Sequence, residues 1–370
     1  MNQLLEDIDE ILLMGPGPSM VAPSVYTALG STTLGHLDPA FIGIMNNIKT
    51  CQQELMQTSH ALTIPVSGTG SAGMETCFVN LVEPGDKVLI LSNGVFGKRM
   101  QDVAGRLRAE VDALEFEWGT PVLLEDVAKK LKDKEYDLVA VVHAETSTGV
   151  ANPVEEIGRL VKNNGNSLYL VDTVTSLGGI PVKVDEWQID AIYSGTQKCL
   201  SCPPGLAPVS FSDKAVEKLK NRQSKVPNWY LDLTMLINYW AGEKRVYHHT
   251  APINMLYGLL EAMDLILKEG LENTFRRHRD NHLYLVEELK PLGIEFLVDQ
   301  PYRLPMLNAV KIPEGVDDAS VRSRLLKEHR IEIGAGLGPL AGKIWRIGLM
   351  GHTSRKENVD RLVAGLKSVL

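Results

Sequence analysis

Short apolar runs alternate with stretches of helical apolar spacing between about residues 60 and 215. We interpret the runs as β-strands, because they are rich in β-branched and other apolar residues, and the stretches as amphipathic helices. This alternation predicts a mainly parallel sheet with helices on both faces and ligands bound where the strands end. The predicted strands are 62–66, 87–92, 137–143, 167–171, 191–193 and 206–211, and the clearest helices are 124–132 and 154–162.

The pattern changes after Pro252. A long helical stretch over 254–290, interrupted near Gly270, precedes an alternation of shorter elements. The predicted strands there are 293–298, 307–312, 331–333 and 344–348, with helices at 317–329 and 355–370, the last begun by a capping box from Ser354 to Glu357. We therefore predict an N-terminal segment (1–20), a large α/β domain (21–265) and a smaller α+β domain (266–370).

Composition narrows the class of protein. The 370 residues carry a formal net charge of −8, which disfavours nucleic-acid and anionic-membrane partners. No apolar run is long enough to span a bilayer, and the acidic start lacks a secretory signal, so we predict a cytoplasmic protein. Four cysteines do not make a disulfide framework.

We predict no metal site. Cys199 and Cys202 have the spacing of half a zinc site, but no second half follows. The adjacent His248 and His249, in what we take as an extended segment, are expected to point to opposite sides.

Lys198 follows a Ser-Gly-Thr-Gln turn after the strand 191–193, and Asp172 ends the preceding strand. This arrangement suits pyridoxal phosphate (PLP). A lysine amine can form a Schiff base with the PLP aldehyde, and a carboxylate can keep the ring nitrogen protonated.

The segment from Ser67 to Gly73 (SGTGSAG) lies between a predicted strand and a helical stretch. Glycines and a helix start predict a phosphate-binding loop. The same letters match the dinucleotide pattern G-x-G-x-x-G, so a nicotinamide-dependent oxidoreductase is the alternative. The acidic residues some twenty positions on, Glu83 and Asp86, lie in a turn before the next strand rather than at its end, which disfavours that alternative.

Two further loops follow predicted strands. Phe96 lies after the strand 87–92, where an aromatic ring can stack on a cofactor, and Ser147 lies among three hydroxyl residues after 137–143. Arg346, in the last predicted strand, has the planar donor fork that binds a carboxylate with two hydrogen bonds.

From residue 12 to the end, the chain resembles the class V aminotransferases of the fold-type I PLP superfamily, and within them the alanine–glyoxylate (serine–pyruvate) branch. The motifs that carry the resemblance are Gly15-Pro16-Gly17-Pro18-Ser19, the Ser67–Ser71 loop, Asn93-Gly94-x-Phe96-Gly97, Glu145-x-Ser147-Thr148-Gly149, Val171-Asp172-x-Val174-x-Ser176-Leu177-Gly178-Gly179, Tyr193-Ser194-Gly195-x-Gln197-Lys198, Tyr247-His248-His249-Thr250, Gly336-Leu337-Gly338-Pro339 and Arg346-Ile347-Gly348.

The resemblance implies a large domain with a mainly parallel sheet of the seven-stranded type between layers of helices, followed by a smaller α+β domain. It also implies a role for each matching residue. Lys198 would bind PLP covalently, Asp172 would pair with its ring nitrogen, Phe96 and Val174 would cover its two faces, and Ser147 would contact the ring hydroxyl region. The phosphate would be held by Thr69, Gly70, Ser71 and Gln197, joined by Tyr247 and Thr250 of a second subunit. Ser71 stands where the animal enzymes have histidine, and Phe96 where several relatives have tryptophan. Arg346 would hold the substrate carboxylate, and Ser147 would also contact the substrate.

These roles predict a homodimeric transaminase with a ping-pong cycle, which takes an amino group from alanine or serine and gives it to a 2-oxo acid, with glyoxylate implied by the resemblance. A single assigned arginine favours small donors over dicarboxylic ones. The alternatives within the family are 2-aminoethylphosphonate and 3-hydroxykynurenine transaminases.

Overall fold

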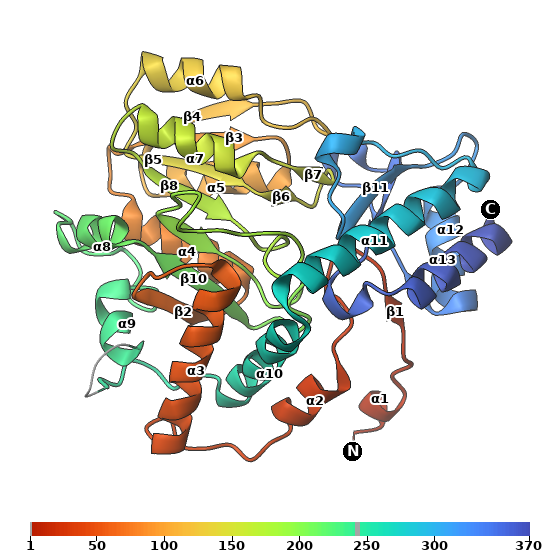
Figure 1. The fold of residues 1–370 in the computed structure, drawn as a ribbon, viewed down its shortest axis with the longest axis horizontal. Helices are drawn as coiled ribbons and strands as arrows, with labels where there is room; N and C mark the ends of the chain where they lie inside the picture. The colour runs from red at the N-terminus through yellow and green to blue at the C-terminus, as the bar shows by residue number, and fades with distance from the viewer. Residues whose placement is uncertain (1, 241–244) are drawn as a thin grey trace.

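A seven-stranded sheet forms the centre of the computed structural model, which describes residues 2–240 and 245–370 (Figure 1). The strand order is β2-β10-β9-β8-β5-β3-β4. Within this sheet β10 runs antiparallel to both neighbours and the other pairings are parallel. The predicted mainly parallel, seven-stranded sheet is therefore confirmed. Its strands are β2 (Leu62–Ser67), β3 (Lys87–Ser92), β4 (Glu110–Glu115), β5 (Leu138–Val142), β8 (Leu168–Asp172), β9 (Ala191–Tyr193) and β10 (Leu206–Phe211).

The edge strand β4 is the sheet strand that the sequence pattern missed. Its sequence, EVDALE, is half polar, and none of its residues is buried. An edge strand pairs on one side only, so its apolar signal is weak.

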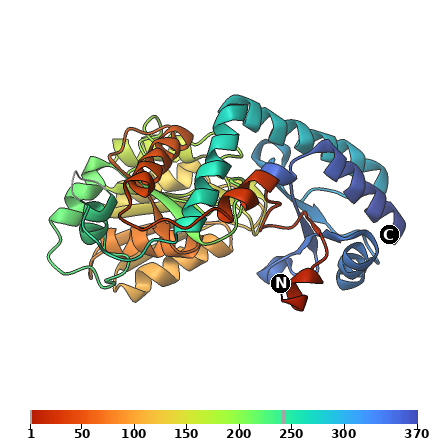
Figure 2. The same ribbon diagram turned by 90° about the horizontal axis from the view of Figure 1, so that it is seen from below.

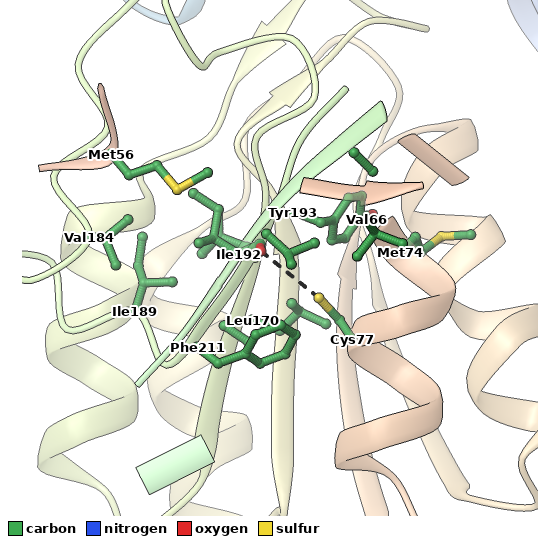
Figure 3. Packing of buried hydrophobic residues seen from close by; sticks show 14 of the residues in the cluster. Met56, Val66, Met74, Cys77, Leu170, Val184, Ile189, Ile192, Tyr193 and Phe211 are labelled. Carbon is green, nitrogen blue, oxygen red and sulfur yellow. Dashed lines mark hydrogen bonds between the residues drawn. The ribbon is translucent and has the colours of Figure 1, made fainter. Parts of the chain in front are cut away.

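Helices cover both faces of the sheet. They are α3 (Pro39–Met56), α4 (Gly70–Leu81), α5 (Val95–Arg106), α6 (Leu124–Asp133), α7 (Val154–Asn163), α8 (Asp213–Lys220) and α10 (Ile253–Glu269). In Figure 3 the α4 residues Met74 and Cys77 lie on one side of Ile192 in β9, while Met56, Val184 and Ile189 lie on the other. Apolar side chains on both faces explain why the central strands read as continuous apolar runs.

The chain leaves the large sheet through α10, turns at Gly270 and continues as α11 (Leu271–Leu289). Beyond it a second hydrophobic core forms, and Figures 1 and 2 show these elements together at one end of the molecule. They are β11 (Leu307–Lys311), α12 (Asp318–His329), β12 (Ile331–Glu332), β13 (Gly334–Ala335), β14 (Ile344–Gly348) and α13 (Lys356–Val369). The domain boundaries stay a prediction.

The N-terminal segment joins this second core. Strand β1 (Leu12–Leu13) pairs with β12, and Leu12 and Met14 are buried there. The remaining elements are α1 (Gln3–Glu6), α2 (Pro23–Leu29), β6 (Ala144–Glu145), β7 (Val150–Ala151), α9 (Leu233–Trp240) and the 3₁₀ turns Lys290–Leu292, Gln300–Tyr302, Gly338–Leu340 and Gly351–Thr353.

Two local predictions are wrong. The predicted strand 293–298 is reduced to one isolated bridge between Phe296 and Val310, because Gly293 still belongs to a turn and the chain bends at Leu297 and Val298. The capping box is absent: α13 has Arg355 at its N-cap, and the Ser354 hydroxyl instead accepts a hydrogen bond from Asn281.

Over the described ranges, no helix is long and apolar enough to cross a membrane. The four cysteines are free thiols, and Cys77, Cys199 and Cys202 are buried.

Candidate active site

One cavity opens where the parallel strands end. Because β2, β3, β5, β8 and β9 run in the same direction, the loops that follow them meet at one edge of the sheet. Eight of the predicted site residues line this cavity: Thr69, Gly70, Ser71, Phe96, Asp172, Val174, Gln197 and Lys198.

Lys198 is buried, with 9% of its surface exposed. Its amine donates a hydrogen bond to the Pro16 carbonyl. Burial, followed by the nearby positive charge of Arg346, lowers the pKa of Lys198 to about 8. A sizeable fraction of this amine is therefore neutral near physiological pH, unlike a surface lysine.

The backbone of the Gly15–Ser19 motif passes close to the Lys198 amine. Gly17 has φ +110°, and a Cβ added there would lie 2.6 Å from the Lys198 Nζ. The Ser19 hydroxyl donates to the Lys198 carbonyl at 2.7 Å. A glycine is required at position 17 both for its backbone conformation and for the space that the lysine occupies.

Asp172 ends β8 with its carboxylate in the cavity wall. It accepts hydrogen bonds from the Val174 amide at 2.8 Å and from the Tyr193 hydroxyl at 2.7 Å. Burial raises the pKa of Asp172 to about 6, and these two bonds oppose that rise. The motif that contains Lys198 begins at Tyr193, but the sequence analysis assigned Tyr193 no role, because its position beside Asp172 becomes evident only from the pairing of β8 with β9.

The start of α4 suits an anionic group. Thr69 is its N-cap but makes no side-chain capping bond, so amides of the first turn stay available. One end of the Gln197 amide, Oε1, is buried without a hydrogen-bond partner in the cavity wall. Turned end for end, the amide offers an N–H donor there. These residues fit a phosphate.

Phe96 and Val174 are among the apolar residues that line the cavity. The guanidinium of Arg99 lies 4.9 Å from the centre of the Phe96 ring, a cation–π contact. Arg99 also lines the cavity, and the sequence analysis missed it. Its position three residues after Phe96 in α5 is the signal that could have found it, since such residues share a helix face.

Ser147 and Arg346 lie beside the cavity rather than in its lining. The Ser147 hydroxyl donates to Glu145 at 2.6 Å and accepts from the Val95 amide at 3.0 Å. Arg346 donates to the carbonyls of Ala335 at 2.7 Å and Thr146 at 3.3 Å. Arg346 is 7% exposed, and burial lowers its pKa.

Tyr247 and Thr250 are not part of the lining of the cavity in their own chain. Both are exposed, and their hydroxyl oxygens are 3.4 Å apart. The expectation that His248 and His249 point to opposite sides is wrong: their Nδ1 atoms are 2.9 Å apart, because this segment is a loop rather than a strand. Within 2–240 and 245–370, no three histidine, cysteine or acidic side chains form a group that could hold a metal ion.

An α/β sheet with a buried, weakly basic lysine, an aspartate at the neighbouring strand end and an anion-binding helix start is the arrangement of a PLP-dependent enzyme of fold type I. The family model of class-V aminotransferases matches residues 23–362. The chain belongs to this family of PLP-dependent transaminases.

Curated relatives share about two fifths of its sequence. A (S)-ureidoglycine–glyoxylate transaminase from Bacillus subtilis is 41% identical, over 97% of this chain and 90% of the relative. An alanine–glyoxylate aminotransferase from Mus musculus is also 41% identical, over 97% of this chain and 87% of the relative. Among solved structures, an alanine–glyoxylate aminotransferase from Nostoc superposes with a TM-score of 0.96 at 50% identity, covering 100% of this chain and 98% of that chain.

Proposed function

We propose that this transaminase takes an amino group from a small amino acid, alanine or serine, and gives it to glyoxylate, with PLP bound at Lys198. The observation that carries the proposal is the buried Lys198 amine facing the same cavity as Asp172, with the cation of Arg346 nearby. PLP, when bound, supplies an aldehyde that reacts with amines and a ring that accepts electrons from the adjacent carbon.

Lys198 moves the proton in this proposal. With PLP bound, Lys198 would hold the cofactor covalently until a substrate amine takes its place. Its free Nζ would then take the proton from the substrate α-carbon as a base and give it back later in the cycle as an acid. A base can do this only when neutral, and a pKa of about 8 makes the neutral amine accessible.

Asp172 stays ionised and holds a proton on the ring nitrogen. The two hydrogen bonds from Val174 and Tyr193 favour its charged form, and a protonated ring nitrogen would favour it further. Thr69, Gly70, Ser71 and Gln197 hold the phosphate, in line with the unused donors at the start of α4.

Arg346 holds the substrate carboxylate. Its Nε and one Nη are fixed by backbone carbonyls, which orients the guanidinium and leaves other N–H groups for a ligand. In this proposal Ser147 contacts the ring hydroxyl region of the cofactor. The preceding residue of the same loop, Thr146, lines the cavity.

Glyoxylate is the acceptor that both curated relatives have in their names, which supports it here. The relatives differ in donor, so (S)-ureidoglycine is a second candidate donor beside alanine and serine. The 2-aminoethylphosphonate and 3-hydroxykynurenine donors are retained as alternatives. Family membership disfavours the nicotinamide-dependent oxidoreductase.

We also propose a homodimer in which Tyr247 and Thr250 complete the phosphate site of the neighbouring subunit. Both side chains are exposed, and neither is part of the lining of the cavity in its own chain. Large apolar side chains beside this segment are also exposed, namely Val246 (57%) and Trp229 (59%), whose ring stacks on His248, and such exposure is typical of a protein–protein interface. Free buried thiols support the predicted cytoplasmic location.

Half-reaction spectra test the substrate proposal. Purified holoenzyme would be mixed with alanine, serine, (S)-ureidoglycine, glutamate, 2-aminoethylphosphonate or 3-hydroxykynurenine, and loss of the near-visible PLP band would be followed. Alanine or serine should convert the cofactor fastest, and glyoxylate should restore the band faster than pyruvate. Conversion by 2-aminoethylphosphonate alone, or no recovery with glyoxylate, would overturn the proposal.

A further inference from the structure

Glu145 is a completely buried carboxylate at the side of the active site, with 0% of its surface exposed. Its Oε1 accepts hydrogen bonds from the Ser147 amide at 3.1 Å and the Ser147 hydroxyl at 2.6 Å. Its Oε2 accepts from the Phe96 amide at 3.2 Å. A Cβ added at Gly94 would lie 2.4 Å from its Cδ, so the backbone of the following helix start approaches it closely.

The directions of these hydrogen bonds indicate that the surroundings of Glu145 stabilise a negatively charged carboxylate. The Val95 amide can only donate, so the Ser147 oxygen accepts from it and turns its own proton toward Glu145. The Ser147 hydroxyl and the amides of Ser147 and Phe96 therefore point at the two carboxylate oxygens, and the Gly97 amide is a further backbone donor to Glu145. Burial and the charge of Asp172 raise the pKa of Glu145, and the hydrogen bonds from Ser147 and Gly97 oppose that rise and limit it to about 7, so the ionised form prevails above that pH.

Two proposed ligand-binding residues depend on this carboxylate in different ways. The backbone amide of Phe96 donates a hydrogen bond to Glu145. Glu145 therefore fixes the first turn of α5 and, with it, the position of the Phe96 ring. Arg346 contacts the carbonyl of the adjacent Thr146, and the charge of Glu145 raises the pKa of Arg346. Across the described residues, no acid lies within ion-pair distance of Arg346, so Glu145 is a counter-charge at longer range.

We propose that Glu145 is a positioning residue with two separable actions: it fixes the Phe96 ring against the cofactor, and it weakens the pull of Arg346 on the substrate carboxylate. The inference rests on the proposed roles of Phe96 and Arg346. A buried anion near a carboxylate-binding cation lowers anion affinity, which favours release of the 2-oxo acid product.

The experiment compares Glu145→Gln with wild type and with the matched control Glu156→Gln, an exposed residue of α7. Glutamine keeps the shape of the side chain, but its NH₂ group cannot accept from the Phe96 amide. The dissociation constant of PLP for apoprotein should rise about tenfold, the usual effect of losing one buried hydrogen bond. Removing the negative charge should tighten propionate binding to holoenzyme, read from the PLP absorbance, by about three- to tenfold.

Opposite changes of the two affinities are the expected result, because general loosening of the site would weaken both. If propionate binds more weakly, or if either constant equals that of wild type, the inference is wrong. Glu156→Gln should change neither constant. Both titrations are independent of turnover, so a failed donor assay would overturn the proposed function without affecting this comparison.

Glu145→Asp separates the two actions and serves if the glutamine variant does not fold. Aspartate keeps the charge but is one methylene shorter, so it cannot reach the Phe96 amide. PLP affinity should fall about tenfold while propionate affinity stays at the wild-type value. Unchanged PLP affinity, or altered propionate affinity, would contradict the assignment.

Discussion

The two ends of the central sheet treat their charged residues differently. At the carboxyl ends, Lys198, Asp172 and Glu145 are buried and have shifted pKa values, and within the described ranges none of them forms an ion pair closer than 4 Å. At the amino ends, Lys218 pairs with Asp86 at 2.9 Å, and Lys214 approaches Asp190 at 3.8 Å.

The amino-end pairs are partly solvated, with side chains 15–30% exposed. Each contributes at most about 1 kcal/mol to stability. Two charged side chains that form an ion pair with each other attract a charged ligand only weakly. Burying a charged group without a close counter-ion lowers the stability of the fold. Such groups are found at functional sites, where a bound molecule supplies the missing partner. We therefore call the amino ends of the strands, where the charges are paired, the structural end of the sheet. The carboxyl ends, where the charges lie in or beside the cavity, are its chemical end.

The largest expected difference between the two ends concerns their lysines. Lys198→Ala should reduce transamination by more than about 10⁴-fold, because both cofactor attachment and proton transfer are lost. Lys218→Ala, at the other end, should keep the wild-type rate. Steady-state assays with alanine and glyoxylate measure both. Near-wild-type turnover of the Lys198 variant would contradict its assignment.

This chemical end was largely predictable from the sequence, because glycine-rich loops and strand-end residues such as Asp172 and Lys198 are local patterns. The parallel sheet was predictable for the same reason, since its buried strands are continuous apolar runs. The sequence could not show contacts that strand pairing and loop packing create. Tyr193 reaches Asp172 from the neighbouring strand, and Gly17 approaches Lys198 from a segment 181 positions away (198 − 17).

Asp172→Asn should slow removal of the substrate α-proton by about 10²-fold, because a neutral amide no longer favours a protonated ring nitrogen. Stopped-flow absorbance after mixing with alanine measures this step. At the other end, Asp86→Asn should leave the rate unchanged and alter stability by less than about 1 kcal/mol. An Asp172 variant with the wild-type rate would exclude the electrostatic role.

The stability of the apoprotein should reveal the cost of burying the Lys198 amine. Its pKa is about 8 in the folded chain and 10.5 in the unfolded chain, so the unfolded state binds more protons between these values. Lys198→Met should therefore raise the free energy of unfolding by about 2–3 kcal/mol below pH 8, and this gain should shrink as pH rises toward 10.5.

Urea denaturation of apoprotein across that pH range measures the gain. Lys218→Met at the paired end should give no such gain and should lower stability slightly. A pH-independent difference between Lys198→Met and wild type would show that the amine is not held in its neutral form.

A smaller effect is expected at the proposed subunit interface. Thr250→Ala should lower the melting temperature of holoenzyme by a few degrees, in line with about 1 kcal/mol for one lost hydrogen bond to the phosphate. Without PLP, the Thr250→Ala variant should melt at the same temperature as wild-type apoprotein. Sedimentation over a dilution series supplies the companion test: holo protein that stays monomeric with PLP fully bound would contradict shared phosphate sites.

Reductive trapping tests the central claim most directly. Holoenzyme treated with borohydride would be digested and the peptide carrying the reduced PLP group sequenced by mass spectrometry. The account predicts one modified residue, Lys198, in the peptide that follows Ser194-Gly195-Thr196-Gln197. Modification of a different lysine, or no modified peptide from protein that shows the PLP absorbance, would contradict it.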